Sequence, residues 1–325
     1  MLTLVPDYYD QFRCLAGACP HSCCEQWEVV IDEAHADFYA QVTGALGEKL
    51  RAALQRDAEG DLCFALNGGR CPFLDDENLC EIHRRLGEEA TSITCQEHPR
   101  FIEDYGPFRE VTLSASCPAA NELLLGSEAP LTFCAREDEE VGEEGDPWLP
   151  HLLVLRQRML EILTDRTRPL TCRLEQFLAL AEAAQPLLDE DTAEELPALV
   201  AEFGDNCSVQ MAVSGTLEAL SALESLEPDW REVLRAAASA PKRPQPEPLL
   251  ERIAVYFAFR YLLKTVNDGD LLSRAQFVVY AVEAVERLAA VCGLSEALRR
   301  FSAEVEHSDE NLETLLETLR WRSGD

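Results

Sequence analysis

Lysine is scarce in this sequence, and positive charge is scarce in general. The 325 residues include three lysines, Lys49, Lys242 and Lys264, and the 28 lysines and arginines together face 60 acidic residues, for a formal net charge of −32. A field this negative repels nucleic-acid phosphates and anionic lipids, so we expect neither a nucleic-acid partner nor a membrane-surface role. A run of about 18 apolar residues is also absent from the sequence, which argues against a membrane-spanning helix.

Further absences concern the N-terminus and known binding motifs. Residues 1–10 contain neither a basic segment nor a long apolar segment, so they do not resemble a signal peptide, and we expect a cytoplasmic protein. The sequence has no GxG motif, which excludes the glycine-rich turn of a Rossmann nucleotide site. It also lacks the paired CxxC motifs of a zinc ribbon. The CxxxCxxC motif of radical S-adenosylmethionine enzymes is incomplete, because Gln26 stands where its third cysteine is needed.

Cysteine, by contrast, is abundant, with 13 residues of which nine fall between Cys14 and Cys117. In a reducing compartment, clustered cysteines are metal ligands or redox groups more often than disulfides. Eight of these cysteines form the candidate metal-ligand set: Cys14, Cys19, Cys23, Cys24, Cys71, Cys80, Cys95 and Cys117.

The chemistry of this set points to a soft metal. Thiolates suit Zn²⁺ or an iron–sulfur cluster, and the spacing alone does not separate the two. One tetrahedral zinc or one [4Fe–4S] cluster needs four thiolates, so eight cysteines predict either two centres or additional supporting and packing roles. The other five cysteines lie in apolar or helical contexts and are expected to be small buried residues: Cys63, Cys134, Cys172, Cys207 and Cys292.

The composition changes near residue 135, and this change predicts the domain organisation. We expect a cysteine-rich metal-binding domain over residues 1–134, an acidic linker over 135–147 and a helical domain over 148–325. The expected fold class is mainly α with small β-hairpins (α+β), in which a metal-binding N-terminal part precedes an irregular helical bundle.

Local patterns predict individual elements. Apolar residues recur at helical spacing over 148–165, 170–188, 208–226, 229–239, 248–266, 271–291 and 309–321. Asp32 and Ser308 are suited to cap the helices that follow them. Hairpins are predicted for 62–74, around an Asn-Gly-Gly turn, and for 101–114, around a Gly-Pro turn.

Several segments also share motifs with known proteins. They are PDYYDQFRCLAGACPHSCCEQWEVVID (6–32), GRCPFLDDENLCEIHRRLGEEATSITCQEHPRF (69–101) and EVTLSASCPAANELLL (110–125), with a weaker similarity in FSAEVEHSDENLETLLETL (301–319). Taken together, these segments resemble the bacterial flagellin lysine-N-methylases, which carry a cysteine-rich, iron–sulfur-binding N-terminal part related to zinc- or iron-chelating CxxCxxCC proteins. His98 departs from the tyrosine expected before Pro99-Arg100 in this pattern.

The resemblance implies an activity, a cofactor and a partner. The activity is transfer of a methyl group from S-adenosylmethionine to the ε-amine of surface lysines on flagellin, and the cofactor is a [4Fe–4S] cluster held by some of the matching cysteines. The acidic composition suits a lysine-rich protein surface as partner, because opposite charge speeds and orients encounter.

Candidate site residues follow from this chemistry. Methylation requires a neutral amine, so a base must take the proton of the acceptor lysine. Glu306, His307 and Glu310 are the candidates for that base, and helix capping and a solvated surface are their alternative roles. Arginines near the matching cysteines could bind a cofactor carboxylate or offset the charge of a thiolate-ligated cluster, or form surface ion pairs; they are Arg13, Arg70 and Arg100.

Two other functional classes fit the same residues. One is a non-enzymatic zinc- or iron-binding protein with a helical interaction domain. The other is an iron–sulfur redox or sensor protein. Iron–sulfur clusters absorb broadly near ~400 nm, so the colour of anaerobically purified protein discriminates a cluster from zinc.

Overall fold

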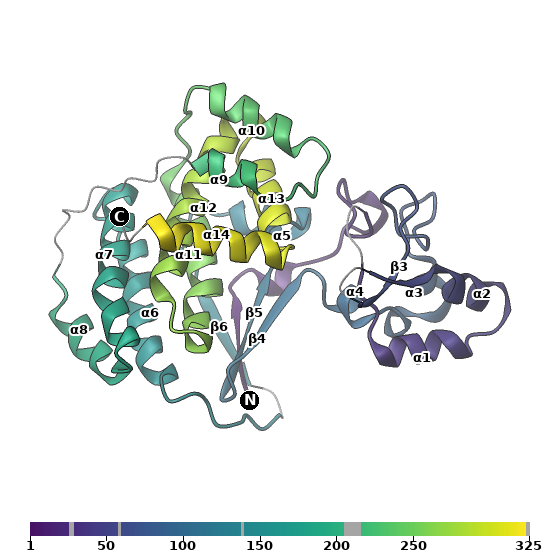
Figure 1. Cartoon of the computed structure of the whole chain (residues 1–325), viewed down its shortest axis with the longest axis horizontal. Coiled ribbons are helices and arrows are strands. Elements are labelled where there is room, and N and C mark those ends of the chain that lie inside the picture. Colours follow the sequence, from purple (N-terminus) through teal and green to yellow (C-terminus); the bar gives the residue numbers. More distant parts are fainter. Residues whose placement is uncertain (26–28, 58–59, 138–139, 205–215, 323–325) are drawn as a thin grey trace. The chain divides into compact units, whose positions relative to one another are not determined.

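The computed structural model describes residues 1–25, 29–57, 60–137, 140–204 and 216–322, and the chain forms two compact units (Figure 1). The Cys-rich unit comprises residues 12–101 and 117–120. The helical unit comprises residues 1–11, 102–116 and 121–325. The protein is mainly α-helical with small β-sheets, which confirms the expected fold class.

The unit boundaries differ from those expected, and a long-range strand pairing is the reason. Strand β1 (Leu2–Pro6) pairs in parallel with β5 (Phe108–Leu113) and antiparallel with β6 (Phe133–Glu137). With β4 (Arg100–Asp104), these strands form a sheet in the order β4-β5-β1-β6. The N-terminal residues therefore belong with the helical unit, so the single boundary at residue 134 is wrong. The start of the expected linker 135–147 is part of β6.

Helices of the helical unit largely follow the predicted ranges. The bounds are α5 Pro118–Leu125, α6 Leu149–Thr164, α7 Leu170–Asp189, α8 Leu196–Glu202, α9 Thr216–Ala222, α10 Trp230–Ser239, α11 Glu247–Tyr261, α12 Leu271–Cys292, α13 Leu294–Val305 and α14 Asp309–Arg322, with 3-10 turns at Tyr9–Gln11, Ala193–Glu195 and Leu262–Asn267. Part of the range predicted for 208–226 lies outside the described residues. None of the helices described is long and apolar enough to cross a membrane.

The core of the helical unit is built on α11 and α12. Phe257, Phe277 and Phe301 meet edge to face or tilted, with ring centroids 5.6 to 6.1 Å apart. Four carboxylates among the described residues of this unit are buried, and three of them lie beside a buried arginine: Glu110 with Arg156 at 2.6 Å, Glu251 with Arg173 at 2.7 Å and Glu306 with Arg260 at 2.7 Å. A buried charge is tolerated only when it is paired in this way.

The Cys-rich unit contains short elements. They are the 3-10 turns Ala16–Ala18 and Glu88–Ala90, helices α1 Glu33–Gln41, α2 Gly44–Ala53, α3 Glu81–Leu86 and α4 Ile93–Glu97, and strands β2 Leu54–Arg56 and β3 Leu62–Phe64. Asp32 caps α1 by accepting the N–H of His35 at 3.1 Å, as expected. The hairpin predicted for 62–74 is wrong, because β3 pairs with β2 instead. The hairpin predicted for 101–114 is confirmed by β4 and β5.

A small aromatic core supports the Cys-rich unit. Tyr39 and Phe73 are fully buried, and Phe64 stacks between them with centroid distances of 5.7 Å and 4.6 Å. The Tyr39 hydroxyl donates a hydrogen bond to the Ala90 carbonyl at 2.8 Å. Cys71 and Cys80 are partly buried against this core, so the core positions two of the candidate ligands.

Candidate functional site

All eight cysteines of the candidate ligand set lie in the Cys-rich unit. Of the five cysteines expected to be small and buried, Cys63 in β3 is buried, whereas Cys134 is exposed and Cys292 is partly exposed. Cys172 is disulfide-bonded, and Cys207 lies outside the described residues. The structure thus separates the candidate set from most of the other cysteines.

Backbone pairing brings the segments of Cys24 and Cys71 side by side. The Cys71 N–H donates to the Cys24 carbonyl at 2.8 Å, next to an antiparallel bridge between Glu25 and Arg70. Backbone hydrogen bonds of this kind fix the separation of two chain segments independently of their side chains. Two cysteines that are distant in sequence are therefore held on adjacent segments.

A tight loop joins Cys71 to Cys80. Its two ends pair through a Leu74–Cys80 bridge, and the Glu81 N–H donates to the Phe73 carbonyl at 2.7 Å. Inside the loop, Asp75 Oδ1 accepts the N–H groups of Glu77 and Leu79, both at 2.9 Å. These N–H groups lower the pKa of Asp75, so the carboxylate stays charged and the loop stays closed.

Four thiols of the Cys-rich unit influence one another electrostatically, and we call them the Cys24 group: Cys24, Cys71, Cys80 and Cys95. Burial, followed by the neighbouring thiols, raises the pKa of Cys71 to about 12 and also raises that of Cys80. Cys95 is exposed as a residue, yet desolvation of its sulfur and the neighbouring Cys24 and Cys80 raise its pKa to about 11. Each of these thiols is thus within electrostatic reach of at least one other thiol of the group.

Three further cysteines form a second set, the Cys14 group: Cys14, Cys19 and Cys117. Burial raises the pKa of Cys117, and the thiols of Cys19 and Cys14 raise it further. Cys23 connects the groups, since its thiol hydrogen-bonds to Cys24 and is also influenced by Cys14 and Cys95. The Cys23 hydrogen bond lowers the pKa of Cys24 to about 7, so the Cys24 sulfur carries the thiolate of this adjacent pair.

The donor set fits a thiolate-ligated metal in number and kind. Burial and mutual repulsion oppose thiolate formation at most of these sulfurs, and a metal ion removes that opposition because it supplies positive charge. Within the described ranges, no three histidine, cysteine, aspartate or glutamate side chains stand in coordinating positions. Metal binding therefore requires the sulfurs of one group to approach one another.

The three candidate arginines have different surroundings. Arg70 lies 3.1 Å from Glu25, donates to Asn78 Oδ1 at 3.0 Å, and helps to lower the pKa of Cys24 through its charge. The guanidinium of Arg100 lies 5.7 Å from the ring centroid of Phe12. Arg13 is exposed and donates to the Phe12 carbonyl at 2.6 Å. The charge of Arg70 thus acts on a candidate ligand.

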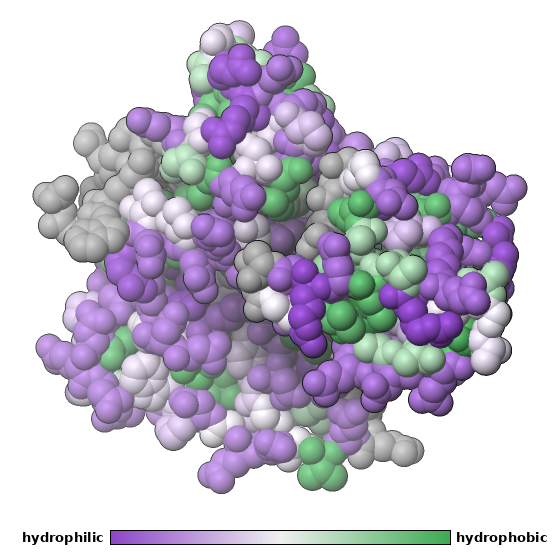
Figure 2. Space-filling view, turned by 45° about the vertical axis from the view of Figure 1, so that its right-hand side comes forward, coloured by the Kyte–Doolittle hydropathy of each residue, from purple (hydrophilic) through white to green (hydrophobic). Residues whose placement is uncertain are grey.

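The surface of the Cys-rich unit carries apolar side chains. Figure 2 shows hydrophobic residues gathered on the visible face of this unit among hydrophilic ones. Val30 and Ile93 are among the exposed apolar residues, and the Thr94 hydroxyl joins their segments by donating to the Val30 carbonyl at 3.2 Å. The segment that carries Cys95 is thus flanked by exposed apolar residues.

Glu306, a candidate base in the helical unit, is completely buried. Its carboxylate accepts hydrogen bonds from Arg260 Nε at 2.7 Å, Tyr261 Oη at 3.0 Å and Ser302 Oγ at 2.6 Å. Tyr256 Oη donates to it at 3.1 Å. A carboxylate with this many donors and no exposed surface favours a structural role over proton abstraction from a protein substrate.

His307 and Glu310 are more accessible. His307 Nε2 hydrogen-bonds to the hydroxyls of Ser114 at 2.9 Å and Ser116 at 2.8 Å, whereas Glu310 is exposed in the first turn of α14. Ser308 caps α14 by accepting the N–H of Asn311 at 3.2 Å, as expected. Neither serine was predicted from the sequence as a site residue, although both lie in the motif segment 110–125.

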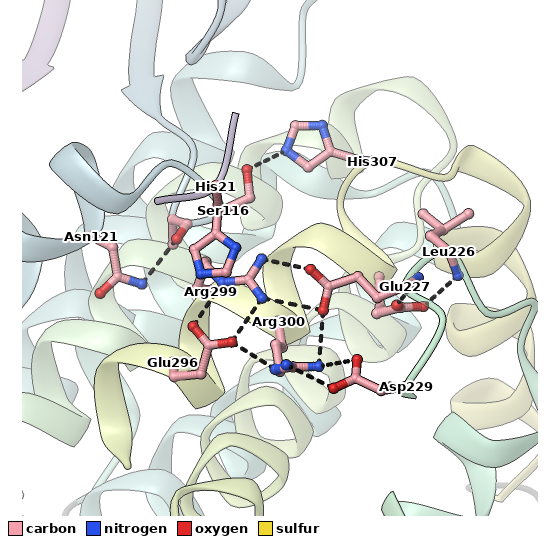
Figure 3. A network of polar contacts seen from close by, with 12 residues as sticks. His21, Ser116, Asn121, Leu226, Glu227, Asp229, Glu296, Arg299, Arg300 and His307 are labelled. Carbon is pink, nitrogen blue, oxygen red and sulfur yellow. Dashed lines mark hydrogen bonds and ion pairs between the residues drawn. The ribbon is translucent and has the colours of Figure 1, made fainter. Parts of the chain in front are cut away.

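An ion network holds α13, the helix that precedes His307 (Figure 3). Arg299 Nη1 contacts Glu227 at 2.7 Å, and Arg300 Nη1 contacts Asp229 at 2.7 Å. Both arginines also pair with Glu296 of the same helix. The network fixes the loop before α10 to α13, and this loop also reaches the buried carboxylate of Glu304.

Glu304 is expected to make stability pH-dependent. Its carboxylate accepts the N–H groups of Leu226 at 2.9 Å and Glu227 at 2.6 Å, yet burial is the larger effect and raises its pKa to about 7. The folded state therefore holds a proton that the unfolded state loses above its ordinary pKa of 4.5. The free energy of unfolding therefore falls by about 3 kcal/mol as pH rises from 4.5 to 7.

Urea unfolding between pH 5 and 8 measures this effect. The variant Glu304→Gln should lack this part of the slope, whereas Glu317→Gln, an exposed control on α14, should keep the wild-type slope. Parallel curves for wild type and Glu304→Gln would show that the Glu304 carboxyl does not titrate in this range.

Comparison with known proteins gives similarity over part of the chain. The flagellar biosynthetic protein FliU of Salmonella muenchen is 26% identical over 126 residues, which cover 37% of this chain and 75% of that protein. Lysine-N-methylases of Salmonella choleraesuis and Salmonella typhimurium are 28% and 27% identical over 126 residues, again 37% of this chain. The resemblance stated from the sequence is thereby confirmed over this part.

The extent of these matches is limited. The chain spans about a third of the length of each lysine-N-methylase, 31% in both cases. No family model matches the chain. No solved structure matches it significantly either.

Proposed function

We propose that this protein transfers methyl groups from S-adenosylmethionine to lysine ε-amines of flagellin, or of a similarly lysine-rich protein, in the cytoplasm. The observation that carries the proposal is the 126-residue similarity to two lysine-N-methylases. The net charge of −32 supports a cationic protein surface as substrate. Eight of the nine cysteines of the Cys-rich unit form the candidate ligand set, and they support a metal cofactor.

A [4Fe–4S] cluster held by the Cys24 group is the cofactor we propose. This group has four thiols that influence one another electrostatically, and four thiolates are what such a cluster needs. Arg70 would offset part of the negative charge of the ligated cluster. Zinc in the same four positions is the alternative, and the Cys14 group would then serve as a second centre or as support.

When bound through three of these four thiols, the cluster would supply a Lewis-acidic iron without a cysteine ligand, able to hold the amino-acid end of S-adenosylmethionine. The binding of the S-adenosylmethionine carboxylate by Arg13 or Arg100 stays a prediction. In the reaction, the neutral lysine nitrogen attacks the methyl carbon, the bond from that carbon to sulfur breaks, and S-adenosylhomocysteine leaves. The nitrogen must lose one proton, and a base accepts it.

His307 is the base that the geometry favours. Two serine hydroxyls hold its imidazole, and it is partly exposed, unlike Glu306. Glu306 directly precedes His307 in the sequence, and its buried ion pair with Arg260 supports the turn from α13 to α14. Glu310 is exposed and is the second candidate for the base.

The variant His307→Gln tests this assignment. It should lower the rate of methyl transfer by about 10²–10⁴-fold, the usual contribution of a general base, without changing the bound iron. His151→Gln, on α6, is the matched control and should keep the wild-type rate. Transfer by His307→Gln at the wild-type rate would remove His307 from the mechanism.

Mass spectrometry tests the proposed function itself. Anaerobically purified protein is incubated with S-adenosylmethionine and flagellin, and each transferred methyl should add about 14 Da to a flagellin lysine. A metal-loaded protein that leaves flagellin unchanged would contradict the proposal. A colourless, zinc-loaded protein that still transfers methyl groups would contradict the cluster and retain the enzyme.

A further inference from the structure

One ring nitrogen of His307 contacts two serine hydroxyls at once. Nε2 lies 2.9 Å from Ser114 Oγ and 2.8 Å from Ser116 Oγ, and the two oxygens lie 2.8 Å from each other. Figure 3 shows the contact of the ring with Ser116. These three polar atoms form a triangle in which every pair is within hydrogen-bond distance. The positions of the hydrogens in this triangle decide which ring nitrogen can accept a proton.

Counting hydrogens assigns the protonated nitrogen of the ring. Each serine has one hydroxyl hydrogen, and a neutral imidazole has one N–H, on either Nδ1 or Nε2. With the hydrogen on Nδ1, two hydroxyl hydrogens would serve three contacts, and lone pairs would face each other across one of them at 2.8 to 2.9 Å. With the hydrogen on Nε2, both oxygens share this N–H in a three-centre bond and one hydroxyl closes the third side. The neutral ring is therefore protonated on Nε2.

The groups next to the triangle agree with this assignment. Ser114 Oγ also accepts the Ser116 N–H at 3.2 Å, so its two lone pairs are used by this N–H and by Nε2–H. Its own hydrogen then goes to Ser116 Oγ. Ser302 Oγ is farther from Ser114 Oγ, at 3.4 Å, and donates its hydrogen to Glu306 at 2.6 Å. The hydroxyl of Ser302 therefore adds no hydrogen to the triangle.

The backbone between the two serines is held on both sides. The Ala115 N–H donates to Tyr256 Oη at 3.3 Å, and the Ala115 carbonyl accepts Asn121 Nδ2 at 2.9 Å. Tyr256 Oη in turn donates to the buried carboxylate of Glu306 at 3.1 Å. Both serines are buried. The two oxygens are thus fixed, and fixed partners at one ring nitrogen set both the orientation and the tautomer of an imidazole.

We propose that Nδ1 of His307 takes the proton that the acceptor lysine loses, and that Ser114 and Ser116 are positioning residues that hold Nε2–H. In this step an N–H bond of the lysine nitrogen breaks and an N–H bond forms at Nδ1. The ring becomes a cation whose Nε2–H stays with the serines. The origin of the proton rests on the proposed function, whereas the tautomer does not.

The same tautomer argues against a serine nucleophile at this position. In a serine–histidine pair, the ring nitrogen next to the hydroxyl takes the serine proton, so that nitrogen must carry a lone pair. Nε2 of His307 carries a hydrogen instead. The two serines therefore orient the ring and do not attack a substrate.

Nitrogen NMR measures the tautomer directly. The full chain, purified anaerobically with ¹⁵N-labelled histidine, is recorded at about pH 8, where a histidine of ordinary pKa is neutral. The resonances missing from His307→Gln identify the ring. We expect a protonated Nε2 and an unprotonated Nδ1, and a proton on Nδ1 would overturn the proposal. The measurement needs neither S-adenosylmethionine nor flagellin, so a failure of this assignment and a failure of methyl transfer are distinguishable.

Substitutions of Ser116 test the positioning role. Ser116→Ala leaves one oxygen at Nε2, so the ring should divide between the two tautomers. The kcat of methyl transfer should then fall by about tenfold, with the KM for flagellin and the bound iron unchanged. Ser116→Thr keeps the hydroxyl and should keep the tautomer. Ser239→Ala, at an exposed position of α10, is the control and should behave as wild type. A wild-type tautomer and rate in Ser116→Ala would overturn the role of this serine.

Discussion

The variant Glu306→Ala is expected to lower the free energy of unfolding by about 3–5 kcal/mol. The Glu306 carboxylate has no exposed surface and pairs with Arg260, which is 5% exposed. Removing the carboxylate leaves the guanidinium buried without its counter-charge. It also takes the acceptor from the hydroxyls of Tyr261 and Ser302. Urea unfolding at neutral pH, followed by circular dichroism, measures this loss.

Glu310→Ala is the matched control, since it removes an exposed carboxylate four residues further along the chain. It should change stability by no more than about 0.5 kcal/mol. If Glu306→Ala is too unstable to purify, Glu306→Gln provides the same comparison with a smaller loss. Equal stability of the Glu306 and Glu310 variants would contradict a structural role for Glu306 and restore it as a candidate base.

Serine substitutions in the Cys24 group are expected to remove the metal. Cys71→Ser and Cys80→Ser each take one thiolate from a set of four, so bound iron should fall to about a tenth of the wild-type content or less. The rate of methyl transfer should fall together with the iron content. Iron analysis and the absorbance of anaerobically purified protein measure both the content and the state of the cluster.

Two further substitutions make this prediction specific. Cys134→Ser, at an exposed position of β6, should leave the iron content unchanged. Cys117→Ser, in the Cys14 group, should retain a cluster held by the Cys24 group. Loss of iron in Cys117→Ser with retention in Cys71→Ser would place the cluster in the other group.

Most helices could be predicted from the sequence, because their signals are local. The apolar spacing predicted α6, α7 and α12 within one or two residues. The boundaries of the units could not be predicted in this way. They depend on the pairing of β1 with β5, in which Leu2 lies opposite Phe108, and nothing in either segment alone specifies a partner so distant in the chain.

The candidate site shows the same division between local and distant information. Cysteine spacing identified eight of the nine cysteines that the Cys-rich unit contains as a candidate ligand set, but it did not separate the Cys24 group from the Cys14 group. That separation depends on the loop from Cys71 to Cys80 and on its pairing with the Cys24 segment. Likewise, the contact between His307 and Ser116 joins residues that are 191 positions apart in the chain.

The dependence of methyl transfer on bound iron is the decisive test of an iron–sulfur methyltransferase. A series of anaerobically reconstituted samples with increasing iron content is assayed with S-adenosylmethionine and flagellin, and the rate is plotted against iron per chain. The rate is expected to rise in proportion to the iron content and to vanish in the iron-free protein. Transfer at the full rate by iron-free protein would contradict it.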